Sequence, residues 1–121
     1  MHTVLVIDDE PDVAELMKIF LGSLGYRTDV FLSGEAAVRA VEAGRYWAVF
    51  CDYQLPKTSG DLLYRTLRSM DGDLVKRFAL FTGAVLDERL EEFMKQEKVR
   101  VIGKPFKLEE IKSIVAEFEK I

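Results

Sequence analysis

Short apolar runs and amphipathic segments alternate five times along this chain, and this alternation constrains its fold more than any other feature. Five runs rich in β-branched or aromatic residues are typical of strands, at 3–7, 28–31, 48–51, 77–81 and 100–102. They are apolar nearly throughout, as expected of strands that are covered by helices on both faces. Strands that alternate with helices predict an α/β fold with a parallel sheet.

A segment with helical periodicity follows each strand. The first carries apolar residues one helical turn apart over 13–24, and the second begins after the candidate N-cap Ser33. The other three are expected to begin near residues 60, 87 and 108. Five such units predict a (βα)5 flavodoxin-like fold with strand order 2-1-3-4-5, helices on both faces, and a binding crevice at the carboxyl ends of the first and third strands.

Polar and charged residues stand where the predicted strands end. In chain order they are Asp8, Asp9, Asp52, Thr82 and Lys104. One such residue alone means little, because any strand that leaves a sheet meets a polar loop. The carboxyl ends of parallel strands meet at one edge, however, so three carboxylates, a hydroxyl and a lysine are expected to share the crevice. Together they predict a functional site.

Carboxylates crowded into one crevice repel each other, and one of them takes up a proton unless a cation joins them. Mg²⁺ fits this role because it prefers oxygen ligands. Zinc is disfavoured, since the expected site holds neither His nor Cys. A carboxylate beside Mg²⁺ can attack a phosphoryl group and form an aspartyl phosphate, while a lysine and a hydroxyl stabilise charge on the phosphoryl oxygens.

Composition excludes several other classes of function. The net charge is −4 and the lysines and arginines are scattered, which argues against a nucleic-acid surface. No apolar stretch approaches the ~20 residues that span a bilayer, so we expect no membrane segment. The single cysteine, Cys51, lies in an apolar run and permits no internal disulfide. We therefore expect a packed thiol and a protein that works in a reducing cytoplasm.

Four motifs resemble those of the response-regulator receiver domain of two-component signalling. They are "VLVIDDE", "FCDYQLPKTSG", "LFTG" and "GKPF", and the similarity extends over the whole chain in the same order. The resemblance implies one receiver domain over 1–121. It implies a signalling domain rather than an enzyme, although such a domain assists its own phosphorylation and dephosphorylation.

The resemblance also implies a role for each site residue. Asp52 is expected to accept the phosphoryl group. Mg²⁺, for which Mn²⁺ is expected to substitute, would be bound by Asp52, by Asp9 directly, by Asp8 through water, and by the backbone carbonyl of Gln54. Thr82 would donate a hydrogen bond to the phosphoryl group, and Lys104 would form an ion pair with it. The Lys104–Pro105 peptide bond is often cis in this family.

The implied phosphoryl donor is a sensor histidine kinase or a histidine phosphotransfer domain. Phosphorylation would change the surface of the fourth helix, fifth strand and fifth helix, through which an unknown output domain or protein reads the signal. A homodimer through that surface is left open. The runs over 51–68 and 81–111 also resemble receivers of hybrid sensor histidine kinases, so the chain is either a stand-alone receiver or a module of a longer protein.

Three positions depart from the resemblance or stay outside it. Many receivers carry an aromatic residue three positions before the lysine, where this chain has Val101. Position 54 is Gln, whereas phosphohydrolases similar to the haloacid-dehalogenase group use a second Asp there as a proton donor. Glu10 is interpreted as an acid at a helix start. The alternatives are therefore a degenerate receiver that acts only as an interaction module and, less favoured, an aspartate-nucleophile phosphohydrolase.

Overall fold

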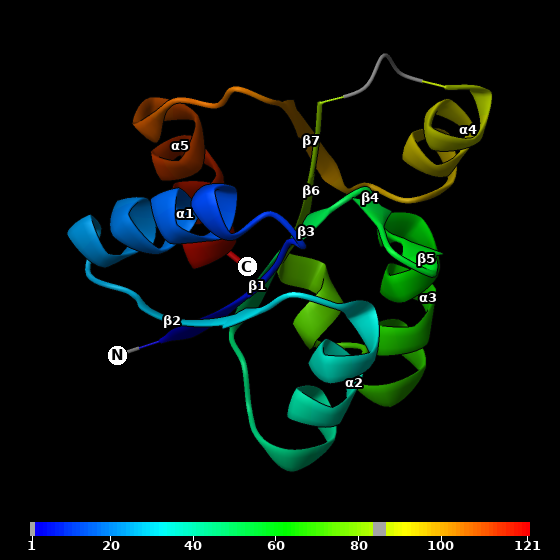
Figure 1. Cartoon of the computed structure of the whole chain (residues 1–121), viewed down its shortest axis with the longest axis horizontal. Coiled ribbons are helices and arrows are strands. Elements are labelled where there is room, and N and C mark those ends of the chain that lie inside the picture. The colour runs from blue at the N-terminus through cyan, green and yellow to red at the C-terminus, as the bar shows by residue number, and fades with distance from the viewer. Residues whose placement is uncertain (1, 84–86) are drawn as a thin grey trace.

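Five parallel strands form the central sheet of the computed structural model, which describes residues 2–83 and 87–121 (Figure 1). The strands are β1 (Thr3–Ile7), β2 (Arg27–Phe31), β3 (Ala48–Asp52), β6 (Phe78–Thr82) and β7 (Arg100–Gly103). Their order is β2-β1-β3-β6-β7, and every neighbouring pair is parallel. The predicted order 2-1-3-4-5 and the α/β fold are confirmed.

Helices cover both faces of this sheet. They are α1 (Pro11–Ser23), α2 (Gly34–Ala43), α3 (Gly60–Met70), α4 (Glu88–Gln96) and α5 (Leu108–Glu119). Figure 1 shows α1 and α5 on one side of the sheet and α2, α3 and α4 on the other. Successive strand residues point to opposite faces. Leu5 and Ile7 therefore pack against the α2–α3–α4 side, whereas Val4 and Val6 pack against α1 and α5.

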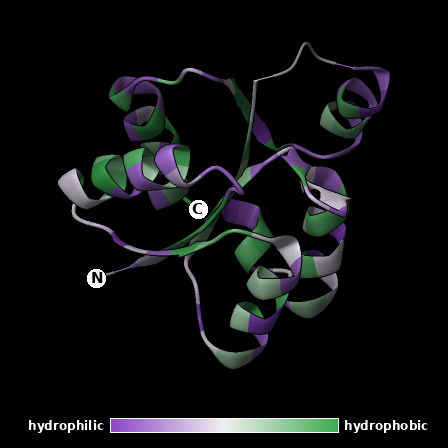
Figure 2. Ribbon diagram, in the orientation of Figure 1, coloured by the Kyte–Doolittle hydropathy of each residue, from purple (hydrophilic) through white to green (hydrophobic). Residues whose placement is uncertain are grey.

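The three inner strands, β1, β3 and β6, are buried as their composition predicts, whereas the residues of the edge strands β2 and β7 are mostly half-buried or exposed. All residues of β3 and β6 are buried, including Asp52 and Thr82 at their carboxyl ends. Figure 2 shows hydrophobic residues along the central strands and polar residues around the loops at the sheet edge. Asp52 and Thr82 are thus polar side chains at the ends of strands, β3 and β6, in which every residue is buried.

Local signals set the helix boundaries. The Ser33 hydroxyl accepts a hydrogen bond from the Ala36 amide at 3.2 Å and caps α2. The Asp87 carboxylate accepts from the Leu90 amide at 2.7 Å and caps α4. Gly25 follows α1 with a φ of 92°, the left-handed conformation that glycine adopts without strain. Four helices begin at residues 34, 60, 88 and 108, within one residue of the predicted starts.

Three short elements were not predicted. Residues Gln54–Leu55 (β4) and Thr58–Ser59 (β5) form a two-stranded antiparallel hairpin directly after β3, and η1 (Leu74–Arg77) precedes β6. The hairpin turns at Pro56 and Lys57, and Lys57 has a φ of 68°. A proline followed by a residue with positive φ is the arrangement of a type II turn. Among the described residues, no helix combines the length and apolarity that crossing a bilayer requires.

Candidate functional site

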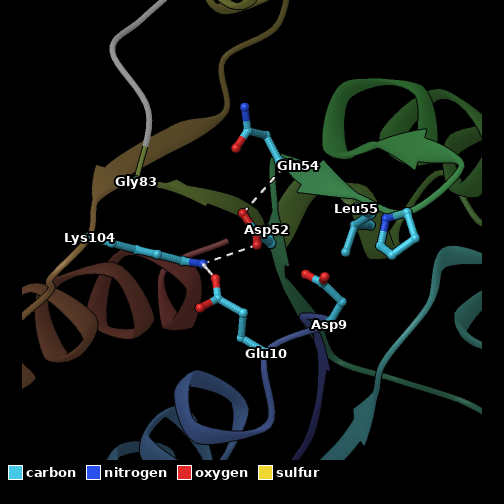
Figure 3. Close-up of a pocket in the computed structure, with 8 residues that line it drawn as sticks. Asp9, Glu10, Asp52, Gln54, Leu55, Gly83 and Lys104 are labelled. Atoms are coloured by element: carbon cyan, nitrogen blue, oxygen red, sulfur yellow. Dashed lines mark hydrogen bonds and ion pairs between the residues drawn. The ribbon is translucent and has the colours of Figure 1, made fainter.

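A cavity of about 430 Å³ opens at the carboxyl ends of β1, β3 and β6, where the fold predicted a crevice (Figure 3). Its lining comes from the loop after β1, the end of β3, the β4–β5 hairpin and the segments after β6 and β7. The lining residues are Asp9, Glu10, Asp52, Gln54, Leu55, Pro56, Gly83 and Lys104. Segments that are far apart in sequence therefore contribute to one polar pocket.

The end of β3 holds Asp52 rigidly at the base of this cavity. Asp52 pairs with Phe81 of β6, and the Tyr53 amide donates to the Phe81 carbonyl at 2.9 Å. The side chain is almost fully buried. Its Oδ1 accepts a hydrogen bond from the Gln54 amide at 3.3 Å, and its Oδ2 accepts one from Lys104 Nζ at 3.0 Å. One carboxylate edge thus faces the loop and the other faces the lysine.

Lys104 brings its ammonium group among three carboxylates. Its Nζ lies 3.0 Å from Asp52 Oδ2, 3.2 Å from Asp8 Oδ2 and 3.2 Å from Glu10 Oε1. Figure 3 shows Lys104 reaching across the pocket toward Asp52, with Glu10 meeting it from the loop after β1. The lysine therefore supplies the positive charge that buried carboxylates need when no other cation is bound.

The electrostatics of the site follow from this burial. Burial raises the pKa of Asp52 to about 6; the hydrogen bond from Lys104 opposes the rise, and the charge of Asp8 adds to it. For Lys104 burial lowers the pKa, but the hydrogen bond and charge of Asp52, the charge of Asp8 and the hydrogen bond with Glu10 outweigh it, so the pKa is raised. The Lys104 ammonium and the ionised Asp52 carboxylate are thus both present at neutral pH.

Asp8 gives the strongest indication of a cation site. The residue is fully buried, and its Oδ1 accepts from the Glu10 amide at 2.9 Å. Its Oδ2 is buried without a hydrogen-bond partner in the described part of the chain, and it forms an ion pair with Lys104 Nζ at 3.2 Å. One carboxylate oxygen from each of Asp8, Glu10 and Asp52 lies within 4.8 Å of the other two. An all-oxygen donor set with an unsatisfied buried carboxylate oxygen fits Mg²⁺.

The remaining predicted site residues lie at the same edge. Asp9 lines the cavity but is exposed and stays outside the compact carboxylate cluster. Gln54 lies at the rim in β4. Thr82 is buried at the end of β6, and its carbonyl accepts from the Lys104 amide at 2.8 Å. The Lys104–Pro105 peptide bond is cis, as the resemblance implied. Val101 is partly buried against the core on the α2–α3–α4 side.

Glu10 is the site residue that sequence analysis missed. It stands at the N-cap position of α1, but its side chain makes no cap hydrogen bond and reaches Lys104 instead. Its backbone is extended, with φ −94° and ψ 108°. Residues two apart in an extended chain point to the same side. The spacing between Asp8 and Glu10 was therefore the signal that could have placed both carboxylates together.

Comparisons with known proteins agree with this geometry. The family model described as the response regulator receiver domain matches residues 4–116. The transcriptional regulatory protein RprY of Bacteroides fragilis is 27% identical over 108 residues, which cover 89% of this chain and 45% of that protein. The chain thus spans less than half the length of this curated relative.

Two solved structures extend the likeness to the fold. The response regulator TrrA of Thermotoga maritima, in complex with Mg²⁺ and BeF, has a TM-score of 0.84 at 28% identity, covering 98% of this chain and 99% of its own. The receiver domain of sensor histidine kinase PA1611 of Pseudomonas aeruginosa, with a magnesium ion in its active-site cleft, has a TM-score of 0.83 at 27% identity, covering 99% and 98%. With a family model that matches nearly its whole length, the chain belongs to the response regulator receiver domain family.

Proposed function

We propose that Asp52 accepts a phosphoryl group from a phosphohistidine, in a reaction that depends on Mg²⁺. The donor would be a sensor histidine kinase or a histidine phosphotransfer domain. The observation that carries this proposal is the position of the Asp52 carboxylate, held at the end of a buried strand and 3.0 Å from Lys104 Nζ. A nucleophile must be ionised and fixed in place, and this arrangement provides both.

In the proposed step a carboxylate oxygen of Asp52 attacks phosphorus and forms the O–P bond. The N–P bond of the donor breaks, and its electron pair returns to the histidine nitrogen. Lys104 leaves its contact with Asp52 for a phosphoryl oxygen, and the Thr82 hydroxyl donates to another. A bound Mg²⁺ would offset the negative charge of the acids and of the phosphoryl oxygens.

The cation would be held by Asp52, Asp8, Asp9 and the backbone carbonyl of Gln54. Asp8 supports this ligand set through its buried Oδ2, which has no hydrogen-bond partner in the described residues. Asp9 and Gln54 support it because both line the same cavity. We propose that Mn²⁺ substitutes, since it also binds carboxylate and carbonyl oxygens.

Receiver domains are signalling domains, and we propose that residues 1–121 form one such domain that catalyses no reaction beyond its own phosphorylation and dephosphorylation. Its output would pass through the surface of α4, β7 and α5 to another domain or protein, or through a homodimer on that surface. Both a stand-alone regulator and a module of a hybrid histidine kinase fit this proposal. A cytoplasmic location and no direct contact with nucleic acid or membrane complete it, in keeping with the buried thiol of Cys51 and the net charge of −4.

The two alternative functions have weaker support. A phosphohydrolase would need an acid to protonate the leaving group, and Gln54 stands where related enzymes place one. A receiver that serves only as an interaction module would not need the carboxylate cluster around Lys104.

Phosphorylation by a small donor tests the proposal directly. The protein is incubated with acetyl phosphate and either Mg²⁺, Mn²⁺ or EDTA, and the intact mass is measured. We expect one added phosphoryl group with either metal, none with EDTA and none in Asp52→Asn. Incorporation that persists in Asp52→Asn would show that another residue is the acceptor, and turnover of a generic phosphate ester would revive the phosphohydrolase.

A further inference from the structure

The N-terminal end of α4 is tied to the loop that follows Asp52 by two polar contacts, which we call the α4 tether. The Tyr53 hydroxyl donates to both carboxylate oxygens of Asp87, at 3.2 and 3.3 Å. Arg89 forms a two-pronged contact with Asp61, with Nε 2.9 Å from Oδ2 and an NH2 nitrogen 3.1 Å from Oδ1. The same Arg89 nitrogen donates to Ser59 Oγ at 2.8 Å. These contacts join the start of α4 to residues that lie 28–34 positions earlier in the sequence.

Burial makes the contact with Asp61 hard to break. The Asp61 side chain is 6% exposed, and it accepts a further hydrogen bond from Ser59 at 2.5 Å. Removing its arginine partner would leave a buried carboxylate without a counter-charge, which is strongly unfavourable. Since α4 buries only Leu90 and Phe93 in the core, these polar contacts hold much of its N-terminal turn in place.

The contact through Tyr53 is also well defined. Tyr53 is buried, and its hydroxyl reaches Asp87 across 34 residues of sequence. Asp87 simultaneously caps α4 through the Leu90 amide. The residue directly after the phosphoacceptor candidate thus bonds to the residue that starts α4.

The tether brackets the hairpin that lines the cavity. Tyr53 precedes β4 and Ser59 ends β5, and the Gly60 amide donates to the Tyr53 carbonyl at 2.7 Å to close the base of the hairpin. The enclosed residues include Gln54, which lies at the rim of the cavity. Figure 1 shows the hairpin and α4 on the same side of the sheet. The position of the hairpin over Asp52 and the position of α4 therefore depend on each other.

We propose that Tyr53 and Arg89 are positioning residues for the cation site at Asp52, and that through the α4 tether they couple cation binding to the N-terminal turn of α4. This inference rests on the proposed function, because it requires that a divalent cation binds at Asp52. Coupling of this kind is reciprocal. A protein that binds α4 in its tethered position raises the affinity for the cation, and the bound cation stabilises the tethered position of α4.

The test uses Mg²⁺ alone and measures two quantities in the full chain. Calorimetric titration gives the dissociation constant, and hydrogen exchange with and without Mg²⁺ gives the protection of α4 amides. The variants are Tyr53→Phe, which removes one hydroxyl, and Arg89→Gln. Arg65→Gln is the matched control, because Arg65 contacts the opposite end of α4 at Gln96 and Glu97 and does not touch the hairpin.

In the wild type, Mg²⁺ is expected to slow exchange at residues 88–96. Tyr53→Phe is expected to raise the Mg²⁺ dissociation constant by about three- to tenfold, the range of one lost hydrogen bond. Arg89→Gln, which loses three, is expected to raise it by at least as much. Both variants are expected to lose most of the Mg²⁺-dependent protection of α4. Arg65→Gln is expected to leave both quantities unchanged, even if it lowers the urea midpoint. A merely structural role would change stability without changing the response to Mg²⁺.

The failures of the two proposals can be told apart. If the wild type binds Mg²⁺, Asp52→Asn does not, and Tyr53→Phe behaves like the wild type in both measurements, the inference about the tether is wrong while the proposed function stands. If the wild type binds no Mg²⁺, the proposed function is wrong and the inference falls with it. Tyr53→Phe decides the first case even if Arg89→Gln does not fold.

Discussion

Gly60 begins α3 directly after the β4–β5 hairpin, and the structure leaves no room for a methyl group there. A Cβ at this position would overlap Leu80 Cδ2 and lie 2.9 Å from the Asp52 carbonyl oxygen and 3.1 Å from Tyr53 Cα. The Leu80 side chain can rotate away, but the other two atoms belong to the backbone that carries Asp52, the proposed phosphoacceptor. Gly60→Ala therefore has to displace the chain at Asp52.

The cost can be bounded from these contacts. Forcing an extra methyl group into a packed site costs about 1–3 kcal/mol, and the two backbone neighbours that would have to shift put Gly60→Ala in the upper part of that range. The higher helix propensity of alanine offsets this loss of stability by at most ~1 kcal/mol. A net loss of about 2 kcal/mol remains, which lowers the urea midpoint by about 1 M at a typical slope of ~2 kcal/mol/M.

Gly22→Ala is the matched control. Gly22 lies in α1, and a Cβ there would meet nothing within 4 Å. This variant is expected to raise the unfolding free energy by about 0.5–1 kcal/mol, because alanine restricts the unfolded chain. Urea denaturation followed by circular dichroism compares both variants with the wild type. Phosphorylation by acetyl phosphate is expected to slow in Gly60→Ala alone. A Gly60→Ala protein as stable as the wild type would refute the steric argument.

Three further outcomes follow from the site and its surroundings. Because the pKa of Asp52 is raised to about 6, the metal-free folded protein binds more protons than the unfolded chain between about pH 4 and 6, and its unfolding free energy falls as pH rises through that window. In Asp52→Asn this decrease in unfolding free energy is expected to be smaller, so that the variant is about 1–3 kcal/mol more stable than the wild type at pH 7 in EDTA. Urea titrations at several pH values measure this difference. If the variant has the same pH profile as the wild type, Asp52 is not the group with the raised pKa. Lys104→Met is expected to tighten Mg²⁺ binding by about tenfold in calorimetry, since the ammonium no longer lies among the three carboxylates; equal or weaker binding would mean that Lys104 does not compete with the cation. Ser33→Ala is expected to cost about 1 kcal/mol through loss of the α2 cap, measured by urea denaturation, and Ser33→Thr to retain most of that stability.

The elements of this fold could be read from the sequence because each has a local physical cause. Apolar runs form strands, of which the inner three are buried on both faces, and the periodic segments form helices that begin after N-caps such as Ser33 and Asp87. The parallel order then brings Asp8, Asp52 and Lys104 to one edge of the sheet. These features depend on burial pattern and topology, which a single sequence expresses directly.

Other features were decided only by tertiary structure. Glu10 looked like an acid at a helix start, yet its extended backbone turns its side chain to Lys104. The hairpin after Asp52 and the contact between Arg89 and Asp61 left no mark in the hydrophobic pattern. Periodicity reports which face of an element is buried, but it carries no information on which polar groups meet across 28 or 94 residues. Those meetings depend on the relative placement of packed elements, and they determine how charge is balanced around Asp52.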